Sequence, residues 1–329
     1  MNKLFMKLSV IVLATMLFAA PAHATGEPRI FGDSLSTNST LSGASSAANS
    51  WAGLTTGAEY NAVSGYKADL LSNLVRLQAV DSREIRMMIG TNDVHIHGNS
   101  TQEKAWFKEF LRCSAAWLVT PTKKFARPAG NFTYTGTWGN TAVNTFGKYT
   151  DGAGASVTGT FTGDSVYVFY IIQKVASAIA DVEINGVNVG TLNSDGTIGS
   201  DSIYADWSHA AHRFSGFGAG THTIKITSRG GIRFYFDGIA DTNQTGDALL
   251  KLGNIAYFSS AFYTSKGITQ ATTDAYNAIV EDVADELIAD GFNVEKVDIN
   301  AEIDPSTDLK SDGVHWQNSG HLKAFNAFN

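Results

Sequence analysis

The hydrophobic pattern of this chain changes twice along its length, and this change constrains the fold more than any other feature. Residues 27–120 and 246–329 combine short apolar runs with segments of helical periodicity. Residues 125–243 are instead rich in Gly, Thr, Ser and aromatic residues, with apolar residues at alternate positions. The pattern predicts one domain inserted into another.

The outer parts have the alternation of strands and helices that is typical of a parallel sheet covered on both faces, an α/β fold. We expect strands at residues 29–32, 60–63, 85–90, 254–259 and 294–299. We expect helices at residues 67–80, 102–119 and 273–290, the last ended by Gly291. In such sheets, ligand-binding groups gather at the carboxyl ends of the strands.

The middle part predicts an all-β sandwich or jelly roll of about 110–120 residues. Strand-like runs occupy residues 165–172, 180–192, 221–228 and 232–239, with Gly-containing turns beside them. We therefore divide the chain into an outer domain, residues 25–122 and 245–329, and an inserted domain, residues 123–244.

Residues 1–24 have the pattern of a secretory signal peptide. Lys3 and Lys7 precede an apolar stretch at residues 8–20, and Ala-His-Ala at 22–24 predicts cleavage after Ala24. We expect a secreted or periplasmic protein without stable membrane insertion after cleavage. An uncleaved membrane anchor is the alternative.

Charge and cysteine content exclude several classes of function. The net charge is −7, and loss of the two signal lysines makes it −9, so nucleic acid and anionic lipid are poor partners. Cys113 is the only cysteine, which excludes an intramolecular disulfide. It lies in a helical apolar pattern, where we expect a small buried side chain.

Ser34 follows the first expected strand, where a parallel sheet would expose it. A serine hydroxyl is a weak nucleophile unless a base takes its proton. Asp312 and His315 lie three residues apart on a Gly-containing loop, a spacing that lets the carboxylate orient the imidazole. Each residue alone has a structural alternative, as a turn or cap residue or a packed histidine.

Four segments, in this order, resemble the sequence blocks of the SGNH hydrolases, also called GDSL esterases/lipases. They are "FGDSLS" (31–36), "YNAVSG" (60–65), "IGTND" (89–93) and "DGVHWQNSGH" (312–321). The resemblance implies a three-layer α/β/α fold with a five-stranded parallel sheet. It covers the outer domain only.

The resemblance also implies residue roles. Ser34 would be the nucleophile, His315 the general base and then acid, and Asp312 the residue that orients His315. The oxyanion hole would consist of the Ser34 and Gly65 backbone N–H groups and the Asn92 side-chain amide. It implies no metal or organic cofactor.

We expect supporting roles for several neighbouring residues. Trp316 stands where the family commonly has proline, and we expect its indole to border the acyl or sugar site. Asp93, His95 and His97 are expected to line the entrance near Asn92, and a metal site formed by the same three residues is the less favoured alternative. Asp33 is expected to fix the Ser34 turn by hydrogen bonding.

Two further features favour structural roles. His321 is expected to cap or pack the final helix. A stripe of large apolar residues at helical spacing is expected to be core: Trp106, Phe107, Phe110, Leu111 and Trp117.

The inserted domain resembles the jelly-roll, carbohydrate-binding-type modules found within some SGNH proteins. Sugars commonly stack on exposed aromatic rings of such modules, and the candidates are Trp138, Tyr149, Tyr204 and Trp207. The alternative is that these rings fill the sandwich core or its contact with the outer domain.

Together, these features predict a serine esterase that removes short acyl groups, such as acetyl, from a polysaccharide. One alternative is a lipase-like or general carboxylesterase acting on lipids or small esters. Another is a catalytically inactive carbohydrate-binding or adhesion protein. The sequence predicts no particular oligomeric state.

Overall fold

The structure is a computed structural model that describes residues 26–79, 81, 83–127, 130–142, 147–243 and 246–329. The expected signal peptide, residues 1–24, lies outside the described residues. Within the described ranges, no helix has the length and apolar character needed to cross a membrane.

A five-stranded parallel sheet with the order β18-β17-β3-β1-β2 lies at the centre of the outer part. Its strands are β1 (Arg29–Gly32), β2 (Glu59–Ala62), β3 (Glu84–Met88), β17 (Leu249–Gly253) and β18 (Val294–Val297). Neighbouring residues point to opposite faces: Phe31 belongs to one buried cluster and Ile30 to another. Both faces of the sheet are therefore covered, as the sequence predicts.

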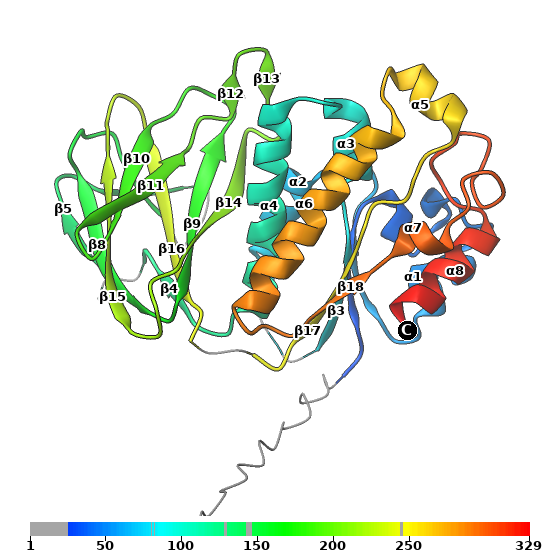
Figure 1. The fold of residues 1–329 in the computed structure, drawn as a ribbon, viewed down its shortest axis with the longest axis horizontal. Coiled ribbons are helices and arrows are strands. Elements are labelled where there is room, and N and C mark those ends of the chain that lie inside the picture. Colours follow the sequence, from blue (N-terminus) through cyan, green and yellow to red (C-terminus); the bar gives the residue numbers. More distant parts are fainter. Residues whose placement is uncertain (1–25, 80, 82, 128–129, 143–146, 244–245) are drawn as a thin grey trace, which may run out of the picture.

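Helices cover the sheet on two sides (Figure 1). Between the sheet and the antiparallel strands lie α2 (Ala68–Val75), α4 (Thr101–Val119) and α6 (Gln270–Ala289). On the opposite side lie α1 (Trp51–Leu54), α7 (Ile299–Glu302) and α8 (Asn318–Phe328). Shorter helices are α3 (Thr91–His97), α5 (Ser260–Lys266) and the 3₁₀ turns η1 (Ser34–Ser36), η2 (Thr40–Ser42) and η3 (Ala47–Asn49).

The expected strand at residues 254–259 is wrong, because β17, the fourth strand of the parallel sheet in sequence order, ends at Gly253. Lys251 interrupts the apolar run in the sequence, yet it is buried and its ammonium donates to the Phe328 carbonyl oxygen (2.7 Å). After β17, the Asn277 side chain bonds both the N–H and the C=O of Ile255 (2.7 and 3.0 Å). These bonds replace the ladder that a strand would need.

Two antiparallel sheets form the inserted part, with the orders β11-β10-β15-β8-β5 and β14-β9-β16-β7-β6, and β4 also pairs with β16. The first sheet comprises β5 (Thr133–Thr135), β8 (Ser156–Thr162), β10 (Ile179–Ile184), β11 (Val187–Asn193) and β15 (Thr221–Ser228). The second comprises β4 (Lys123–Phe125), β6 (Gly139–Asn140), β7 (Lys148–Thr150), β9 (Ser165–Gln173), β14 (Trp207–Ser215) and β16 (Phe234–Asp241). A small hairpin joins β12 (Thr197–Ile198) to β13 (Asp201–Ser202).

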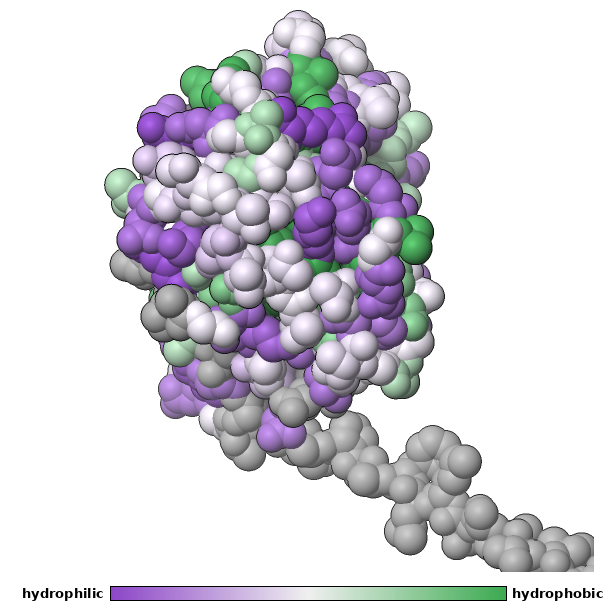
Figure 2. Space-filling model, turned by 90° about the vertical axis from the view of Figure 1, so that its left-hand side faces the viewer, coloured by the Kyte–Doolittle hydropathy of each residue, from purple (hydrophilic) through white to green (hydrophobic). Residues whose placement is uncertain are grey.

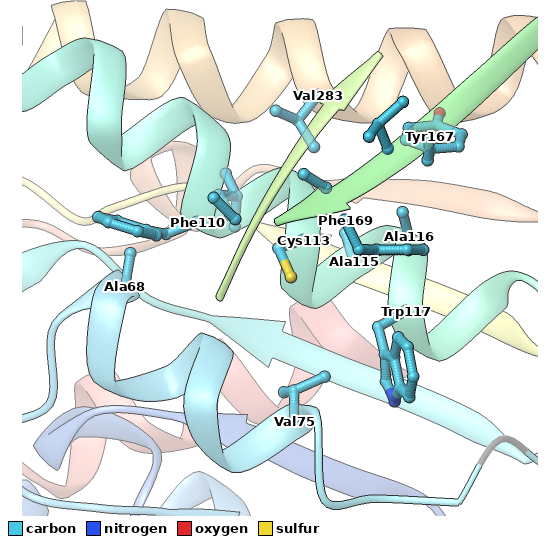
Figure 3. Packing of buried hydrophobic residues seen from close by; sticks show 14 of the residues in the cluster. Ala68, Val75, Phe110, Cys113, Ala115, Ala116, Trp117, Tyr167, Phe169 and Val283 are labelled. Atoms are coloured by element: carbon cyan, nitrogen blue, oxygen red, sulfur yellow. The ribbon is translucent and has the colours of Figure 1, made fainter. Parts of the chain in front are cut away.

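One continuous apolar cluster joins the inserted part to the outer part (Figure 3). The stripe of large apolar residues on α4 is part of this cluster, which confirms its expected core role. The ring of Trp117 packs edge-on against Phe169 of β9, with 5.4 Å between the ring centroids. Cys113 of α4 is fully buried in the same cluster, and burial raises the pKa of its thiol. Sheet, helices and sandwich thus share a core.

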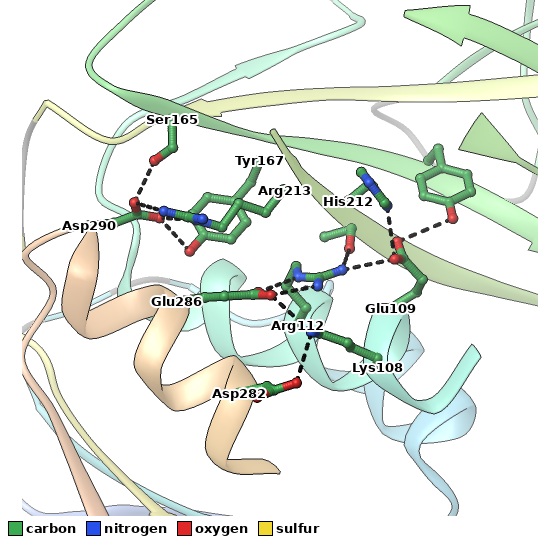
Figure 4. A network of polar contacts seen from close by, with 12 residues as sticks. Lys108, Glu109, Arg112, Ser165, Tyr167, His212, Arg213, Asp282, Glu286 and Asp290 are labelled. Carbon is green, nitrogen blue, oxygen red and sulfur yellow. Dashed lines mark hydrogen bonds and ion pairs between the residues drawn. The ribbon is translucent and has the colours of Figure 1, made fainter. Parts of the chain in front are cut away.

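A polar network reinforces this contact (Figure 4). Asp290, the residue that caps α6 at its C-terminus, accepts from Arg213 Nη2 (2.6 Å) and Nε (2.8 Å) and from the Tyr167 hydroxyl (2.7 Å). Arg112 of α4 donates to Glu286 of α6. Strand β14 is therefore attached to the helices by an ion pair and β9 by a hydrogen bond, in addition to apolar packing.

Candidate active site

Ser34, His315 and Asp312 form one chain of hydrogen bonds. His315 Nε2 lies 3.1 Å from Ser34 Oγ, and His315 Nδ1 lies 2.9 Å from Asp312 Oδ2. The side chain of His315 is 31% exposed and that of Asp312 48% exposed, so the imidazole is reached from solvent. This is the spatial order that nucleophile, base and orienting acid need.

The turn that carries Ser34 is fixed by its neighbours. β1 ends at Gly32 and η1 begins at Ser34, and the Leu35 N–H donates to Asp33 Oδ1 (3.0 Å). The expected turn-fixing role of Asp33 is thereby confirmed. Burial raises the pKa of the Asp33 carboxyl to about 6, against the opposing effect of hydrogen bonds from Leu35 and Thr91.

The loop that carries His315 is closed by backbone hydrogen bonds. The Lys310 N–H donates to the His315 carbonyl oxygen (2.8 Å), and the Gly313 N–H donates to the Lys310 carbonyl oxygen (2.9 Å). Asp312 Oδ1 accepts from the amides of Val314 and His315, at 2.9 Å each. The loop therefore holds the carboxylate beside the imidazole.

Burial acts to raise the pKa of Asp312, but hydrogen bonds from the Val314 and His315 amides and from the His315 ring outweigh it. The pKa of Asp312 therefore lies below its usual value. An ionised Asp312 selects the tautomer with hydrogen on Nδ1 and leaves Nε2 free to accept from Ser34.

The expectation that the Trp316 indole borders the acyl or sugar site is wrong. Trp316 is fully buried in the second apolar cluster, together with Trp51 and Phe328. An isolated β-bridge between Leu309 and Trp316 brings the two ends of the loop together. The buried indole holds the loop in place on its side away from solvent.

His321 packs behind the same loop, as expected. Its Nε2 lies 3.1 Å from the Ser42 carbonyl oxygen, and its Nδ1 lies 3.4 Å from the Trp51 backbone nitrogen. Burial lowers the pKa of His321 to about 4. A neutral imidazole satisfies both partners, since one ring nitrogen donates and the other accepts.

The expected oxyanion residues follow neighbouring strands. Gly32 pairs with Ala62 of β2 and Met88 of β3, so Ser34, Gly65 and Asn92 leave the sheet at one edge. Gly65 has a φ of +81° and open space beside its Cα. Asn92 Nδ2 donates to the Tyr66 carbonyl oxygen (2.8 Å), which ties α3 to the Gly65 turn.

The three polar residues after Asn92 have separate partners. His95 Nε2 lies 3.1 Å from Asn92 Oδ1, and burial lowers the pKa of His95 to about 4. Asp93 is buried and accepts from the Ala68 N–H at the start of α2 (3.1 Å), so its expected place at the entrance is wrong. His97 lies between Lys67 and Glu103.

Among the described residues, no group of three or more His, Cys, Asp or Glu side chains has the arrangement of a metal site.

The candidate sugar-stacking rings differ in exposure. Trp138 packs on Tyr134 with a centroid distance of 5.3 Å, and its Nε1–H donates to the Thr135 carbonyl oxygen (3.2 Å). It follows β5, at the end of the sandwich far from α5 in Figure 1. Trp207 lies at the contact with α2, where its carbonyl oxygen accepts from Asn73 (2.9 Å).

The other two candidates are tyrosines. Tyr149 packs on Tyr235 with a centroid distance of 5.8 Å, and the Arg233 guanidinium lies over it. Tyr204 is 58% exposed, and the Lys67 ammonium lies 4.1 Å from its ring centroid. Figure 2 shows the sandwich end of the molecule as mainly hydrophilic to neutral, with small separate hydrophobic areas.

A polar groove of about 530 Å³ borders the His315 loop, and the sequence interpretation did not identify it. It is lined by Gly43, Ser45, Lys310, Ser311, Gln317, Asn318 and Ser319. The signal available was the run of polar residues on both sides of His315, but their common surface depends on η2 and α8 meeting in space.

No protein-family profile and no curated protein matches the chain. Among solved structures, a two-domain esterase active on acetylated mannans, co-crystallised with mannopentaose, matches with 7% identity and a TM-score of 0.36. That match covers 67% of this chain and 91% of the esterase.

Carbohydrate-binding modules match shorter parts of the chain. CBM36 in complex with calcium and xylotriose has 18% identity and a TM-score of 0.27, over 36% of this chain and 98% of the module. CBM35 from Cellvibrio japonicus Abf62 has 15% identity and a TM-score of 0.28, over 39% of this chain and 98% of the module. TM-scores below 0.5 do not establish a common fold.

Proposed function

We propose that this protein is an exported serine esterase of the SGNH hydrolase type that removes short acyl groups, chiefly acetyl, from a polysaccharide. The observation that carries the proposal is the chain of contacts from Ser34 Oγ to His315 Nε2 (3.1 Å) and from His315 Nδ1 to Asp312 (2.9 Å). These contacts join residues that are 281 positions apart in the sequence.

In the first half of the reaction, Ser34 Oγ attacks the ester carbonyl carbon while its proton passes to His315 Nε2. Asp312 stabilises the resulting imidazolium. The tetrahedral intermediate then collapses, its bond to the alcohol oxygen breaks, and His315 donates the proton to that oxygen. The products of this half are a free hydroxyl on the substrate and an acyl group on Ser34.

In the second half, water attacks the acyl carbon and gives its proton to His315 Nε2. The bond to Ser34 Oγ breaks, and His315 returns the proton to the serine. A carboxylic acid is released. These reaction steps require no metal or organic cofactor.

Negative charge develops on the carbonyl oxygen in both halves. The proposed donors are the Ser34 and Gly65 backbone N–H groups and the Asn92 amide. The described contact to Tyr66 uses one Asn92 amide hydrogen, and the second hydrogen of the same NH₂ group remains to donate. Loss of one such donor typically costs about 2.7–4 kcal/mol of barrier.

The polar lining of the groove beside His315 favours a carbohydrate over a lipid substrate. A lipase-like site would need an extended apolar surface next to the nucleophile. The groove presents hydroxyl, amide and ammonium groups instead. The proposed export rests on the sequence pattern of residues 1–24.

Hydrolysis of p-nitrophenyl acetate and of a longer-chain p-nitrophenyl ester, by wild type and Ser34→Ala, tests the proposal. We expect wild type to prefer the acetate and Ser34→Ala to lose turnover on both. Ser46→Ala is the matched control, because this serine caps η3 without a side-chain hydrogen bond. Equal turnover by wild type and Ser34→Ala, or none by either, would contradict an esterase centred on Ser34.

A further inference from the structure

We propose that the polar groove binds the sugar residues that carry the ester, that is, the alcohol side of the substrate. The inference rests on the proposed esterase function and adds a binding site to it. It follows from where the groove lies, from the direction in which the reaction passes its proton, and from the chemistry of the lining.

The groove lies directly against the catalytic loop. A Cβ built on Gly43 would come within 2.8 Å of the His315 Cβ and 2.4 Å of the Trp316 carbonyl oxygen, so the Gly43 wall touches the His315 side chain and the Trp316 backbone. Ser311, which also lines the groove, directly precedes Asp312. The groove therefore borders the loop that carries the proposed base, His315.

The reaction requires the alcohol to lie on this side. His315 must hand its proton to the leaving alcohol oxygen, whereas the carbonyl oxygen must face the donors near Asn92. These two oxygens are bonded to the same carbon and point in different directions from it. An ester that is attacked by Ser34 therefore places its alcohol next to His315 and its acyl group elsewhere.

The lining suits a neutral carbohydrate. It offers the hydroxyls of three serines, the Lys310 ammonium, the Gln317 side-chain oxygen and the part of the Asn318 amide that Ser45 leaves unused, with no carboxylate and no large apolar side chain. Hydroxyls and amides both donate and accept, as neighbouring sugar hydroxyls require. The volume of about 530 Å³ lies within the roughly 300–1,000 Å³ of small-ligand sites.

Part of the wall is already held in place. Asn318 Oδ1 accepts from the Ser45 N–H (2.9 Å) and Asn318 Nδ2 donates to Ser45 Oγ (2.8 Å), which ties the start of α8 to the segment after η2. Gln317 Nε2 donates to the Leu309 carbonyl oxygen (2.7 Å). A preformed wall lowers the entropy cost of binding.

The test compares two substrates on three variants. Ser319→Trp fills the groove from the exposed first turn of α8, and Lys310→Ala removes its ammonium while keeping the backbone N–H that holds the His315 loop. Asn326→Trp, exposed on the same helix outside the groove, is the matched control. The substrates are p-nitrophenyl acetate and chemically O-acetylated xylopentaose.

We expect Ser319→Trp to lower kcat/KM for the acetylated pentasaccharide by about 10-fold or more, and Lys310→Ala by about 5-fold, the effect of one lost hydrogen bond. Both should keep kcat/KM for p-nitrophenyl acetate within about 2-fold of wild type, which also shows that they fold. Asn326→Trp should match wild type on both substrates. Unchanged pentasaccharide turnover in Ser319→Trp would overturn the inference.

Binding of the acetylated pentasaccharide to Ser34→Ala, measured by calorimetry, separates this inference from the esterase proposal. Weaker binding in Ser34→Ala/Ser319→Trp than in Ser34→Ala/Asn326→Trp supports the groove even if wild type hydrolyses no ester. A different outcome is that wild type hydrolyses p-nitrophenyl acetate while Ser34→Ala/Ser319→Trp binds the pentasaccharide with the same affinity as Ser34→Ala. That outcome overturns the groove inference and leaves the esterase proposal standing.

Discussion

His95 Nε2 lies 3.1 Å from the side-chain oxygen of Asn92. Since burial lowers the pKa of His95 to about 4, the ring is neutral near pH 7, and its N–H donates to that oxygen. The contact fixes which end of the Asn92 amide carries the NH₂ group. His95 is therefore a positioning residue for the proposed oxyanion donor.

We predict that His95→Ala lowers kcat for p-nitrophenyl acetate by about 10-fold with little change in KM, because the Asn92 amide loses its orientation. His95→Gln, whose amide is able to donate to the same oxygen, should recover part of the loss. Steady-state kinetics on the three proteins check this. A rise in KM at constant kcat would assign His95 to substrate binding instead.

Gly313 lets the His315 loop pass close to the start of α5. Its φ is +75°, and a Cβ there would lie 2.1 Å from Ser259 Oγ. We predict that Gly313→Ala moves the loop and lowers kcat by at least about 10-fold, since a misplaced catalytic group costs this much or more. Gly267→Ala is the control: its φ is +65° but nothing lies within 4 Å of the added carbon.

Both glycine variants should lose about 1–2 kcal/mol of stability from the left-handed backbone. Only Gly313→Ala should lose activity. If both retain wild-type kcat, the position of the His315 loop does not depend on this close approach.

The raised pKa of Asp33 predicts a pH dependence of stability. Its pKa is about 6 in the fold and 3.8 ordinarily, so between these values the unfolded chain loses its proton while the folded chain keeps it. Stability from this group is therefore highest below about pH 4 and falls as the pH rises to about 6. A difference of about two pKa units corresponds to roughly 3 kcal/mol.

Asp33→Asn removes this titration and keeps an acceptor for the Leu35 N–H. We predict that, relative to wild type, the variant gains roughly 3 kcal/mol in the free energy of unfolding between pH 3.5 and pH 7. Urea unfolding of both proteins at the two pH values measures it. An unchanged difference between the two proteins would show that Asp33 does not titrate in this range.

The ion pair between Asp290 and Arg213 predicts how much the attachment of the sandwich contributes to the free energy of unfolding. The two side chains are 3% and 16% exposed, and loss of the carboxylate leaves a largely buried guanidinium and the Tyr167 hydroxyl without this acceptor. We predict that Asp290→Ala costs about 3–5 kcal/mol in the free energy of unfolding.

The matched control is Asp181→Ala, which breaks a pair with Arg229 in which both partners are substantially exposed. We expect it to cost less than about 1 kcal/mol. Urea unfolding followed by tryptophan fluorescence compares the two variants. Similar small losses in both would mean that the apolar core alone attaches the sandwich.

The sequence predicted the parts of the structure that depend on local pattern. A continuous apolar run identified β9, and alternation identified β15. The Asn-Gly turn between β10 and β11 follows from the ability of Asn185 and Gly186 to adopt positive φ. The short motifs around Ser34 and His315 identified residues that the fold brings within 3.1 Å.

The sequence misled where long-range contacts decide. Trp316 adjoins His315, but alternate residues of an extended loop face opposite sides, and the β-bridge to Leu309 turns this one inward. Asp93 was assigned to the entrance because nothing local shows that α2 begins next to it. Lys251 interrupts the apolar run of β17, so the sequence pattern does not indicate a strand there. That this lysine is buried follows only from its distant partner, the Phe328 carbonyl oxygen.

The shared core makes the sandwich a permanent part of this protein. A chain shortened by residues 123–244 would uncover the face of α4 that carries Cys113 and Trp117. Such a surface self-associates in water. With this interface the sandwich is not separable from the rest of the molecule, so any new property of its surface must arise by side-chain replacement on a retained scaffold.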